Sequence, residues 1–361
     1  MLKNKGRIET LQILRAIAFL EIFLGHCGIT FFTGAFGVSI FIVLSGFCMG
    51  LNYLPKADKF SLSLVSNVKN ALGKVKKLYG LHLIMLAAAF LLAKMPTSAE
   101  AMKRLVMDVL LLQSLSPYSA DFFSYNGVAW YLSAYLVICI FSLYVIKLIS
   151  MCKSRKCVIT AATVVYALMV VVGFAVTKKV INIGDGFAFW FTYIFPGYRL
   201  LEFALGVLLG WLYLNAKKKE CSKVVFSTAI ESVAVIAFIA VIKVFHKMEG
   251  IYDGICYTAL FTPVSLFLTA VFAMSKGWLM KLFNNPVFLW LGNLSAYTFL
   301  IHQVVIRWLR QVLDIYYSGE HFVLILTILS FVMTGIAAMF VQYLSKMKTK
   351  IDNYYKEMKV P

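Results

Sequence analysis

The feature that most constrains this chain is a series of apolar runs, each about twenty residues long and rich in Leu, Ile, Val, Phe, Ala and Gly. A helix of that length crosses roughly 30 Å of hydrocarbon. Hydrophobic residues make up 61% of the sequence and the mean hydropathy is +0.83, whereas soluble domains are about 45–50% apolar. Because a backbone in lipid must satisfy its own hydrogen bonds, helices are the expected spanning elements. The sequence therefore predicts an all-α integral membrane protein.

Breaker residues and charges divide the chain into ten predicted spans, all within one transmembrane domain that covers residues 1–361. The predicted spans are 10–30, 34–53, 78–94, 128–149, 158–177, 197–214, 225–245, 254–274, 288–311 and 322–345. A further apolar stretch, 104–116, is too short to cross comfortably and carries Arg104 and Asp108. We expect it to form a short re-entrant or interfacial helix.

Basic residues indicate the orientation of the spans. Thirty-five Lys and Arg against 16 Asp and Glu give a formal net charge of +19, and most of the excess lies between the apolar runs. The basic segments are 1–7, 56–77, 153–156, 217–223, 276–281 and 346–359. With ten spans, all six fall on one side, as expected of cytoplasmic loops. Both termini are therefore predicted to be cytoplasmic, and this distribution argues against binding of nucleic acid.

The first apolar stretch begins with charged residues, as a signal peptide does. However, Arg15, Glu21 and His26 interrupt it, and no small-residue cleavage site follows. We therefore expect a retained first helix. The seven cysteines are scattered without a CxxC motif, so the sequence predicts no disulfide framework.

Arg15 and His26 lie eleven positions apart on the first predicted span. At 100° per residue both side chains project from one face of the helix, about 16 Å apart along its axis. Ionisable residues within a membrane helix are costly, face the bundle interior and usually mark function. The bland alternative is a structural polar network that fixes helix packing.

The segment from Ile8 to Gly50 resembles the opening of membrane-bound acyltransferase family 3, typified by bacterial polysaccharide O-acetyltransferases. The family begins with a Leu-Arg-Ala-Ile-Ala helix, a His ten intervening residues after its Arg, and a Gly-Val-x-x-Phe-Phe-x-Leu-Ser-Gly-Phe helix. The matching residues here are Arg15, His26, Gly37, Val38, Phe41, Leu44, Ser45, Gly46 and Phe47.

Later segments match the family in the same order, so the resemblance covers almost the whole chain. They are Trp130-Tyr131-Leu132, Arg199 with Glu202-Phe203-x-x-Gly206, and the block from Leu291 to His302. Within that block, Phe299 replaces the family's Tyr. The family's cytoplasmic Arg-x-x-Arg, followed by an aromatic residue and Pro, becomes Lys74-Val75-Lys76-Lys77-Leu78-Tyr79-Gly80. Lysine supplies charge to a phosphate without the planar fork of arginine.

The resemblance implies an acyl-CoA donor, usually acetyl-CoA, on the cytoplasmic side of a bacterial cell membrane. It implies a hydroxyl of a cell-envelope glycan or glycolipid as acceptor on the other side. No permanently bound cofactor or metal is expected. The residues assigned to catalysis are His26, Arg15, Glu202 and His302. Those assigned to donor binding are Lys74, Lys77, Arg199 and Trp130.

Several roles stay open on the sequence alone. His26 suits either a general base for the acceptor hydroxyl or a carrier of the acyl group. His302 suits either a second polar role or a satisfied core histidine. Glu21 stands where the family usually has an apolar residue, and a salt bridge within the bundle is its plainest explanation. Ser45 is expected to serve close packing rather than nucleophilic attack.

Two other classes of protein fit the same charges. In a proton- or anion-coupled transporter, Arg15, Glu21, His26, Glu202 and His302 would form a path through the bundle. The sequence shows neither an inverted repeat nor a pair of broken helices in corresponding halves, which such transporters carry. A membrane scaffold for glycan export would need no thioester chemistry.

Overall fold

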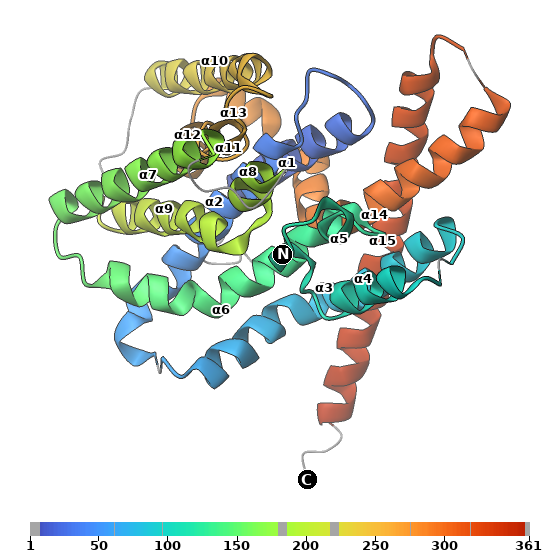
Figure 1. Cartoon of the computed structure of the whole chain (residues 1–361). Helices are drawn as coiled ribbons and strands as arrows, with labels where there is room; N and C mark the ends of the chain where they lie inside the picture. Colours follow the sequence, from blue (N-terminus) through green and yellow to red (C-terminus); the bar gives the residue numbers. More distant parts are fainter. Residues whose placement is uncertain are drawn as a thin grey trace.

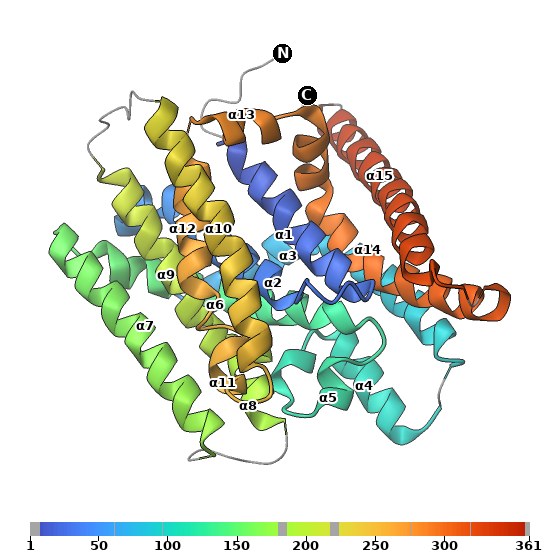
Figure 2. The same cartoon turned by 90° about the horizontal axis from the view of Figure 1, so that it is seen from above.

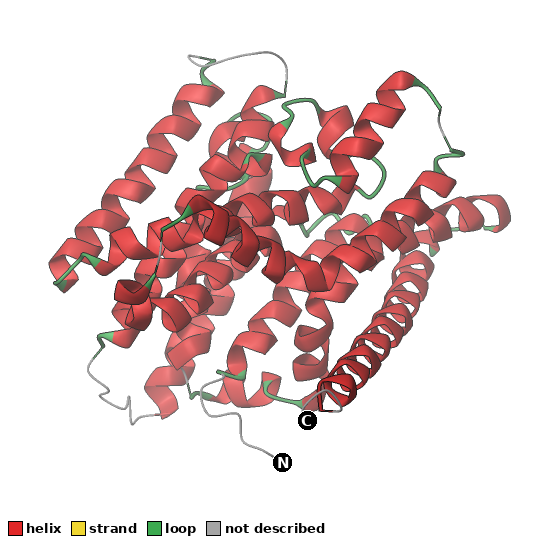
Figure 3. Ribbon diagram, turned by 90° about the horizontal axis from the view of Figure 1, so that it is seen from below, coloured by secondary structure: helices red, strands yellow, loops and turns green. Residues whose placement is uncertain are grey.

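The computed structural model describes residues 8–60, 62–95, 97–179, 186–216, 224–274, 276–317 and 319–357, with side chains to residue 347. Every regular element in these ranges is helical, as Figure 3 shows by the absence of strands there. Of the basic segments, 1–7 and 217–223 lie outside the described residues. The protein is an integral membrane helical bundle, in agreement with the predicted fold class.

Each of the ten predicted spans overlaps helical structure in the described chain. Eight helices of the described chain are long and apolar enough to cross a membrane. They are α2 (Ala35–Tyr53), α3 (Leu64–Leu92), α6 (Trp130–Ser150), α7 (Arg155–Thr177), α9 (Pro196–Leu214), α10 (Val224–Met248), α14 (Pro286–Tyr316) and α15 (Phe322–Glu357). The other two, α1 (Thr10–His26) and α12 (Thr262–Met274), are shorter. The number of crossings and the side on which the termini lie stay predictions.

The predicted span 254–274 is not one helix. A four-residue helix, α11 (Asp253–Cys256), is separated by turns from α12. Pro263 explains the break, since proline is tolerated in the first turn of a helix and not in its interior. Gly254 of α11 packs so closely on the backbone of Gly173 in α7 that a side chain at either position would overlap the other's carbonyl oxygen.

The basic segment 56–77, predicted to be a loop before the third span, is largely helical. Lys69, Lys74, Lys76 and Lys77 lie on α3, which starts at Leu64 rather than at residue 78. Charges mark where a helix leaves the bilayer but do not end it, and 29 residues extend for about 44 Å. That length exceeds a hydrocarbon core of roughly 30 Å, so the charged first turns have room beyond it.

The short non-spanning helix lies earlier than predicted. Instead of 104–116, α4 covers Ala99–Val109 and begins where the Ser98 hydroxyl accepts a hydrogen bond from the Ala101 amide. After it the backbone turns at Leu111, which has a positive φ of 54°, and continues into a short 3₁₀ turn, Gln113–Leu115. The predicted helix runs through this turn because the apolar content of the sequence does not change there.

Helix α2 lies inside the bundle, between α1 and α9, and α15 packs on α14 at the edge (Figures 1 and 2). Gly46 and Gly206 make the α2–α9 contact possible, because a Cβ at Gly46 would overlap the Phe203 carbonyl and one at Gly206 the Val43 carbonyl. Close packing through small residues is a common solution in membranes. The packing interpretation of the Ser45-Gly46-Phe47 motif therefore has a direct structural basis.

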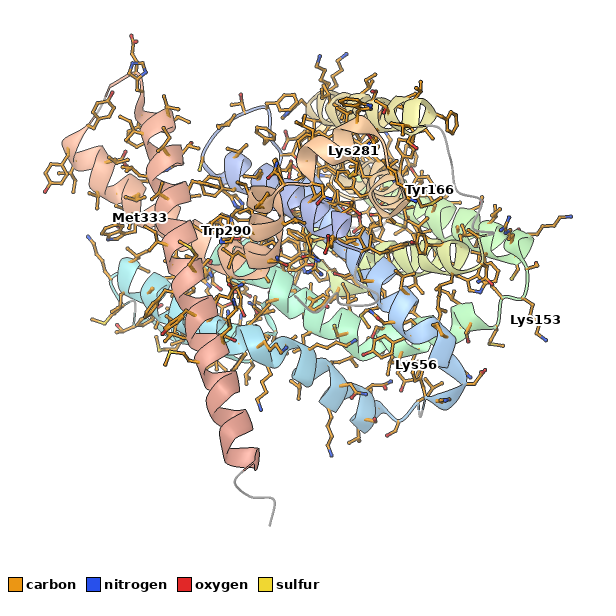
Figure 4. The ribbon with its side chains drawn as sticks, turned by 180° about the vertical axis from the view of Figure 1, so that it is seen from behind. Lys56, Lys153, Tyr166, Lys281, Trp290 and Met333 are labelled. Carbon is orange, nitrogen blue, oxygen red and sulfur yellow. The ribbon has the colours of Figure 1, made fainter. Side chains whose placement is uncertain are left out.

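The two ends of the bundle differ. Figure 2 places the start of α1, the end of α15 and the short helix α13 (Trp278–Phe283) at one end. Helices α4, α5 (Ser119–Phe122), α8 (Phe187–Phe189) and α11 gather at the other. In Figure 4, Lys56, Lys153 and Lys281 lie on the face turned toward the viewer. The predicted basic side is thus the end that carries α13.

Candidate active site

Two histidines meet at the centre of the candidate site. His26 is the last residue of α1 and His302 lies in the middle of α14, and Nδ1 of His26 is 2.8 Å from Nε2 of His302. Their rings stack with centroids 5.0 Å apart. The helices come this close because Gly292 of α14 faces the Gln12 carbonyl of α1, where a side chain would overlap the backbone.

Backbone carbonyls fix the position of the protons in this pair. Nδ1 of His302 lies 2.7 Å from the Phe299 carbonyl oxygen and 3.2 Å from that of Thr298. Carbonyl oxygens only accept, so Nδ1 of neutral His302 carries the hydrogen and its Nε2 is an acceptor. His26 must then donate through Nδ1, which leaves the lone pair on its Nε2. That nitrogen accepts no hydrogen bond from the described residues and is available as a base or nucleophile.

His26 lines a cavity of about 220 Å³, which we call the histidine cavity. Six of its other fourteen lining residues are aromatic, and Gln303, one residue after His302, is a polar neighbour. The lining residues are Ile22, His26, Thr33, Gly34, Ala35, Val38, Phe123, Gly127, Val128, Trp130, Phe189, Tyr193, Tyr257, Phe299 and Gln303. Gln303 accepts a hydrogen bond from the Val128 amide at 2.8 Å, which holds the segment before α6 against α14.

Arg15 lies in a second cavity of about 190 Å³, which we call the arginine cavity. Its lining residues are Arg15, Phe41, Ser45, Lys74, Leu78, Tyr131, Leu132, Tyr135, Ser295, Ala296, Phe299 and Leu300. The ammonium of Lys74 lies 4.9 Å from the centre of the Tyr53 ring. Ser45 donates to the Phe41 carbonyl at 2.7 Å, so its hydroxyl hydrogen is directed at backbone rather than at a base.

Arg199 and Glu202 form a separate buried cluster one helical turn apart on α9. Their side chains are fully buried and 3.1 Å apart. Arg199 also donates to Thr258 at 2.7 Å. Glu202 accepts hydrogen bonds from Ser39 of α2 and Thr262 of α12. A buried pair with such partners joins three helices, and removing one member would leave an uncompensated charge.

Glu21 has a role that the sequence interpretation missed. One carboxylate oxygen accepts hydrogen bonds from the Thr33 amide and hydroxyl and from the Gly34 amide, at 2.8–3.0 Å. The other accepts from the Gly37 amide at 2.7 Å. Glu21 therefore holds the N-terminus of α2, where unpaired amides and the helix dipole favour an anion. The expected salt bridge is replaced by these contacts.

The structure brings together only part of the predicted site. His26 and His302 contact each other, and Arg15 and Lys74 share the arginine cavity. Trp130, assigned to the donor, lines the histidine cavity instead. The remaining assigned residues line neither cavity, since Lys77 is exposed on α3 and Arg199 and Glu202 are enclosed. Tyr193, however, lines the histidine cavity and lies beneath the Arg199 guanidinium, 5.6 Å from ring centre to Cζ.

The fold and site thus define a helical membrane protein in which two contacting histidines lie beside a cavity. Comparison with known proteins agrees: the chain belongs to the family described as the acyltransferase domain, which matches residues 8–344. Similar proteins include candidate O-acetyltransferases of Staphylococcus aureus strains COL and MSSA476, each 27% identical over 342 residues and covering 86% of this chain. The chain spans about half the length of these relatives, 52%. No solved structure matches it significantly.

Proposed function

We propose that this protein transfers an acyl group, with acetyl as the first choice, from acyl-CoA to a hydroxyl of an extracytoplasmic carbohydrate. The observation that carries the proposal is that His26 lines a cavity and keeps Nε2 uncommitted, while its Nδ1 is held by His302. A transporter path would not require a histidine with one nitrogen fixed and the other free. Family membership supports acyl transfer as the class of reaction.

The arginine cavity is our candidate donor site. Arg15 and Lys74 are the two cations that line it, and coenzyme A carries a pyrophosphate and a 3′-phosphate. Lys77 lies one turn further along α3 on the exposed surface and would add positive charge close to Lys74. Arg199, enclosed with Glu202, serves in this scheme as a positioning residue for α9 rather than as a contact for the donor.

The histidine cavity is our candidate acceptor site. Trp130, Tyr193 and Tyr257 offer flat apolar faces, and Gln303 offers an amide, a combination suited to the faces and hydroxyls of a sugar. Trp130 therefore belongs to the acceptor side in this proposal. The cell membrane of a bacterium is the proposed location, and the histidine cavity lies farther along α1 from the basic end of the bundle (Figure 2) than the arginine cavity does.

The chemistry follows from the fixed protons. Nε2 of His26 removes the proton of the acceptor hydroxyl as its oxygen attacks the thioester carbonyl. The new imidazolium donates through Nδ1 to His302, and this hydrogen bond strengthens as charge develops. The carbon–sulfur bond then breaks, and the thiolate of coenzyme A takes the proton from His26. Alternatively, Nε2 attacks the thioester first, and the carbon–sulfur bond breaks to release the thiolate of coenzyme A. The acyl-imidazole then passes its acyl group to the hydroxyl, and the hydroxyl proton is taken up by that thiolate.

Variants of His26 test the proposal. With labelled acetyl-CoA and purified protein, we expect His26→Ala and His26→Gln to lose transfer, because neither side chain exchanges a proton near neutral pH. The Gln variant keeps a hydrogen-bonding side chain, so it should stay folded and still bind acyl-CoA. His321→Gln, at an exposed position, is the matched control and should keep activity.

Robust transfer by His26→Gln would overturn the assignment. Absence of donor turnover by the parent with all acceptors tried would overturn acyl transfer itself and favour transport. Mass spectrometry of envelope glycans from a deletion strain would identify the acceptor by the acyl groups it loses.

A further inference from the structure

Phe299 forms part of the wall of both cavities. Its ring is almost fully buried and has edge contacts with Tyr131 and Phe41, at centroid distances of 5.1 and 6.2 Å, and a tilted contact with His302 at 5.8 Å. His26 lines only the histidine cavity, whereas Arg15 and Lys74 line only the arginine cavity. Phe299 therefore lies in the wall shared by the proposed donor cavity and the cavity that His26 lines.

The order of lining residues along the helices shows that the two cavities are stacked. On α14, Ser295 lines the arginine cavity, Phe299 lines both, and Gln303 lines the histidine cavity. Along α1 the order is Arg15 and then His26, and along α2 it is reversed, from Val38 to Ser45. Three helices thus agree on one axis, with the Phe299 ring at the level between the cavities.

We propose that Phe299 is a movable partition that controls passage of the acyl group from the arginine cavity to His26. This inference rests on the proposed acyl transfer. Side chains on a helix lean toward its N-terminus, and the turn below Phe299 carries the small residues Ser295 and Ala296, both lining the arginine cavity. A change of χ1 between staggered rotamers would move the ring into or out of that space.

The partition has two consequences for specificity. First, a closed ring keeps the thioester away from water in the histidine cavity until the acceptor is bound. Without it, water would attack the thioester carbonyl, the carbon–sulfur bond would break, and the products would be a carboxylic acid and the free thiol of coenzyme A. Second, the ring limits the length of acyl group that can pass, which favours acetyl over longer chains.

Substitution of the ring tests both consequences. Phe299→Ala should raise acetyl-CoA hydrolysis without acceptor and lower the ratio of transfer to hydrolysis at least tenfold. It should also accept butyryl-CoA at a rate closer to that of acetyl-CoA. Phe299→Tyr keeps the ring and should resemble the parent in both measurements. An unchanged ratio and an unchanged chain-length preference in a folded Phe299→Ala protein would overturn the proposal, and Phe299→Leu is the substitute if the Ala variant unfolds.

A labelling experiment separates failure of the partition from failure of the proposed function. Ser45→Cys places a thiol in the arginine cavity, and a membrane-impermeant thiol reagent is added to sealed vesicles from the side of the histidine cavity. We expect the introduced thiol to be labelled at least tenfold faster when Phe299→Ala is present than when it is not. In each case, labelling of the native cysteines is measured in the same protein without Ser45→Cys and subtracted. Equal rates with and without Phe299→Ala would refute the partition whether or not acyl-CoA is turned over. Faster labelling with Phe299→Ala, combined with no donor turnover by the parent protein, would refute acyl transfer and support the partition.

Discussion

Replacing His302 by Leu removes the acceptor that faces Nδ1 of His26 and places an apolar side chain of similar bulk between α1 and α14. In the proposed mechanism, the hydrogen bond between the two rings joins neutral groups before reaction and a charged donor afterwards. A neutral hydrogen bond contributes about 0.5–1.5 kcal/mol and one to a charged group about 1.5–3 kcal/mol. The part gained only in the transition state is therefore on the order of 1–1.5 kcal/mol.

This difference corresponds to a loss of roughly 5- to 13-fold in kcat. A second effect adds to it, because without His302 the hydrogen of His26 is free to move to Nε2, which removes the base. We therefore expect kcat to fall about tenfold or more, with little change in KM for acyl-CoA, since an interaction that strengthens in the transition state acts on kcat.

The assay is steady-state acetyl transfer by variants matched for folded protein. His302→Gln should recover part of the lost rate, because its amide oxygen can accept from Nδ1 of His26. His82→Leu is the control for loss of a buried imidazole, since His82 is fully buried and bonds the Asp108 carbonyl outside both cavities. A kcat for His302→Leu within twofold of the parent, with His82→Leu equally active, would refute the fixed-tautomer argument.

Three further predictions follow from single contacts. Lys74→Gln should raise KM for acyl-CoA severalfold and Lys77→Gln much less, because Lys74 is the one of these two lysines that lines the arginine cavity. A KM for Lys74→Gln equal to that of the parent would remove Lys74 from the donor site. Gly46→Ala should destabilise the protein by about 1–3 kcal/mol through overlap with α9, whereas Gly73→Ala, with open space around it, should not; equal melting temperatures in detergent would contradict this. Burial raises the pKa of the Asp108 carboxyl on α4 to about 7, whereas the pKa of an Asp in the unfolded chain is about 3.9. The folded state therefore holds an extra proton between these values, and stability should fall as pH rises through this window and level off above it. Asp108→Asn should flatten that fall in thermal unfolding, and an identical pH profile would disprove it.

The apolar pattern was enough to locate the helices, and the places where it failed share a physical cause. Hydropathy reports where lipid can be, whereas a helix ends where backbone hydrogen bonding ends. Thus α3 continues through four lysines toward Leu64, and Pro263 divides one apolar run into α11 and α12. These differences concern local backbone geometry, to which an average over about twenty residues is insensitive.

The candidate site was predictable only within single helices. The shared face of Arg15 and His26 follows from helical geometry, but the contact between His26 and His302 joins residues 276 positions apart and depends on the close approach at Gly292. The resemblance to a family named both histidines without placing them together. For Glu21, a usable signal was present: a carboxylate one turn before the end of α1 and glycines at positions 34 and 37, where a new helix begins.

Three ionisable residues on α1 illustrate how a membrane bundle separates structure from chemistry. Burying a charge in a medium of low polarity is costly unless the charged group is paired or hydrogen-bonded. Glu21 meets this condition through four hydrogen bonds at the N-terminus of α2, and it lines neither the histidine cavity nor the arginine cavity. Arg15 faces a cavity that can admit an anion, which makes it a binding group. His26 is satisfied on one nitrogen and open on the other, a combination that a purely structural histidine does not need. We infer that a buried polar residue in such a bundle takes part in chemistry when it lines a cavity and the fold leaves one of its hydrogen-bonding positions open.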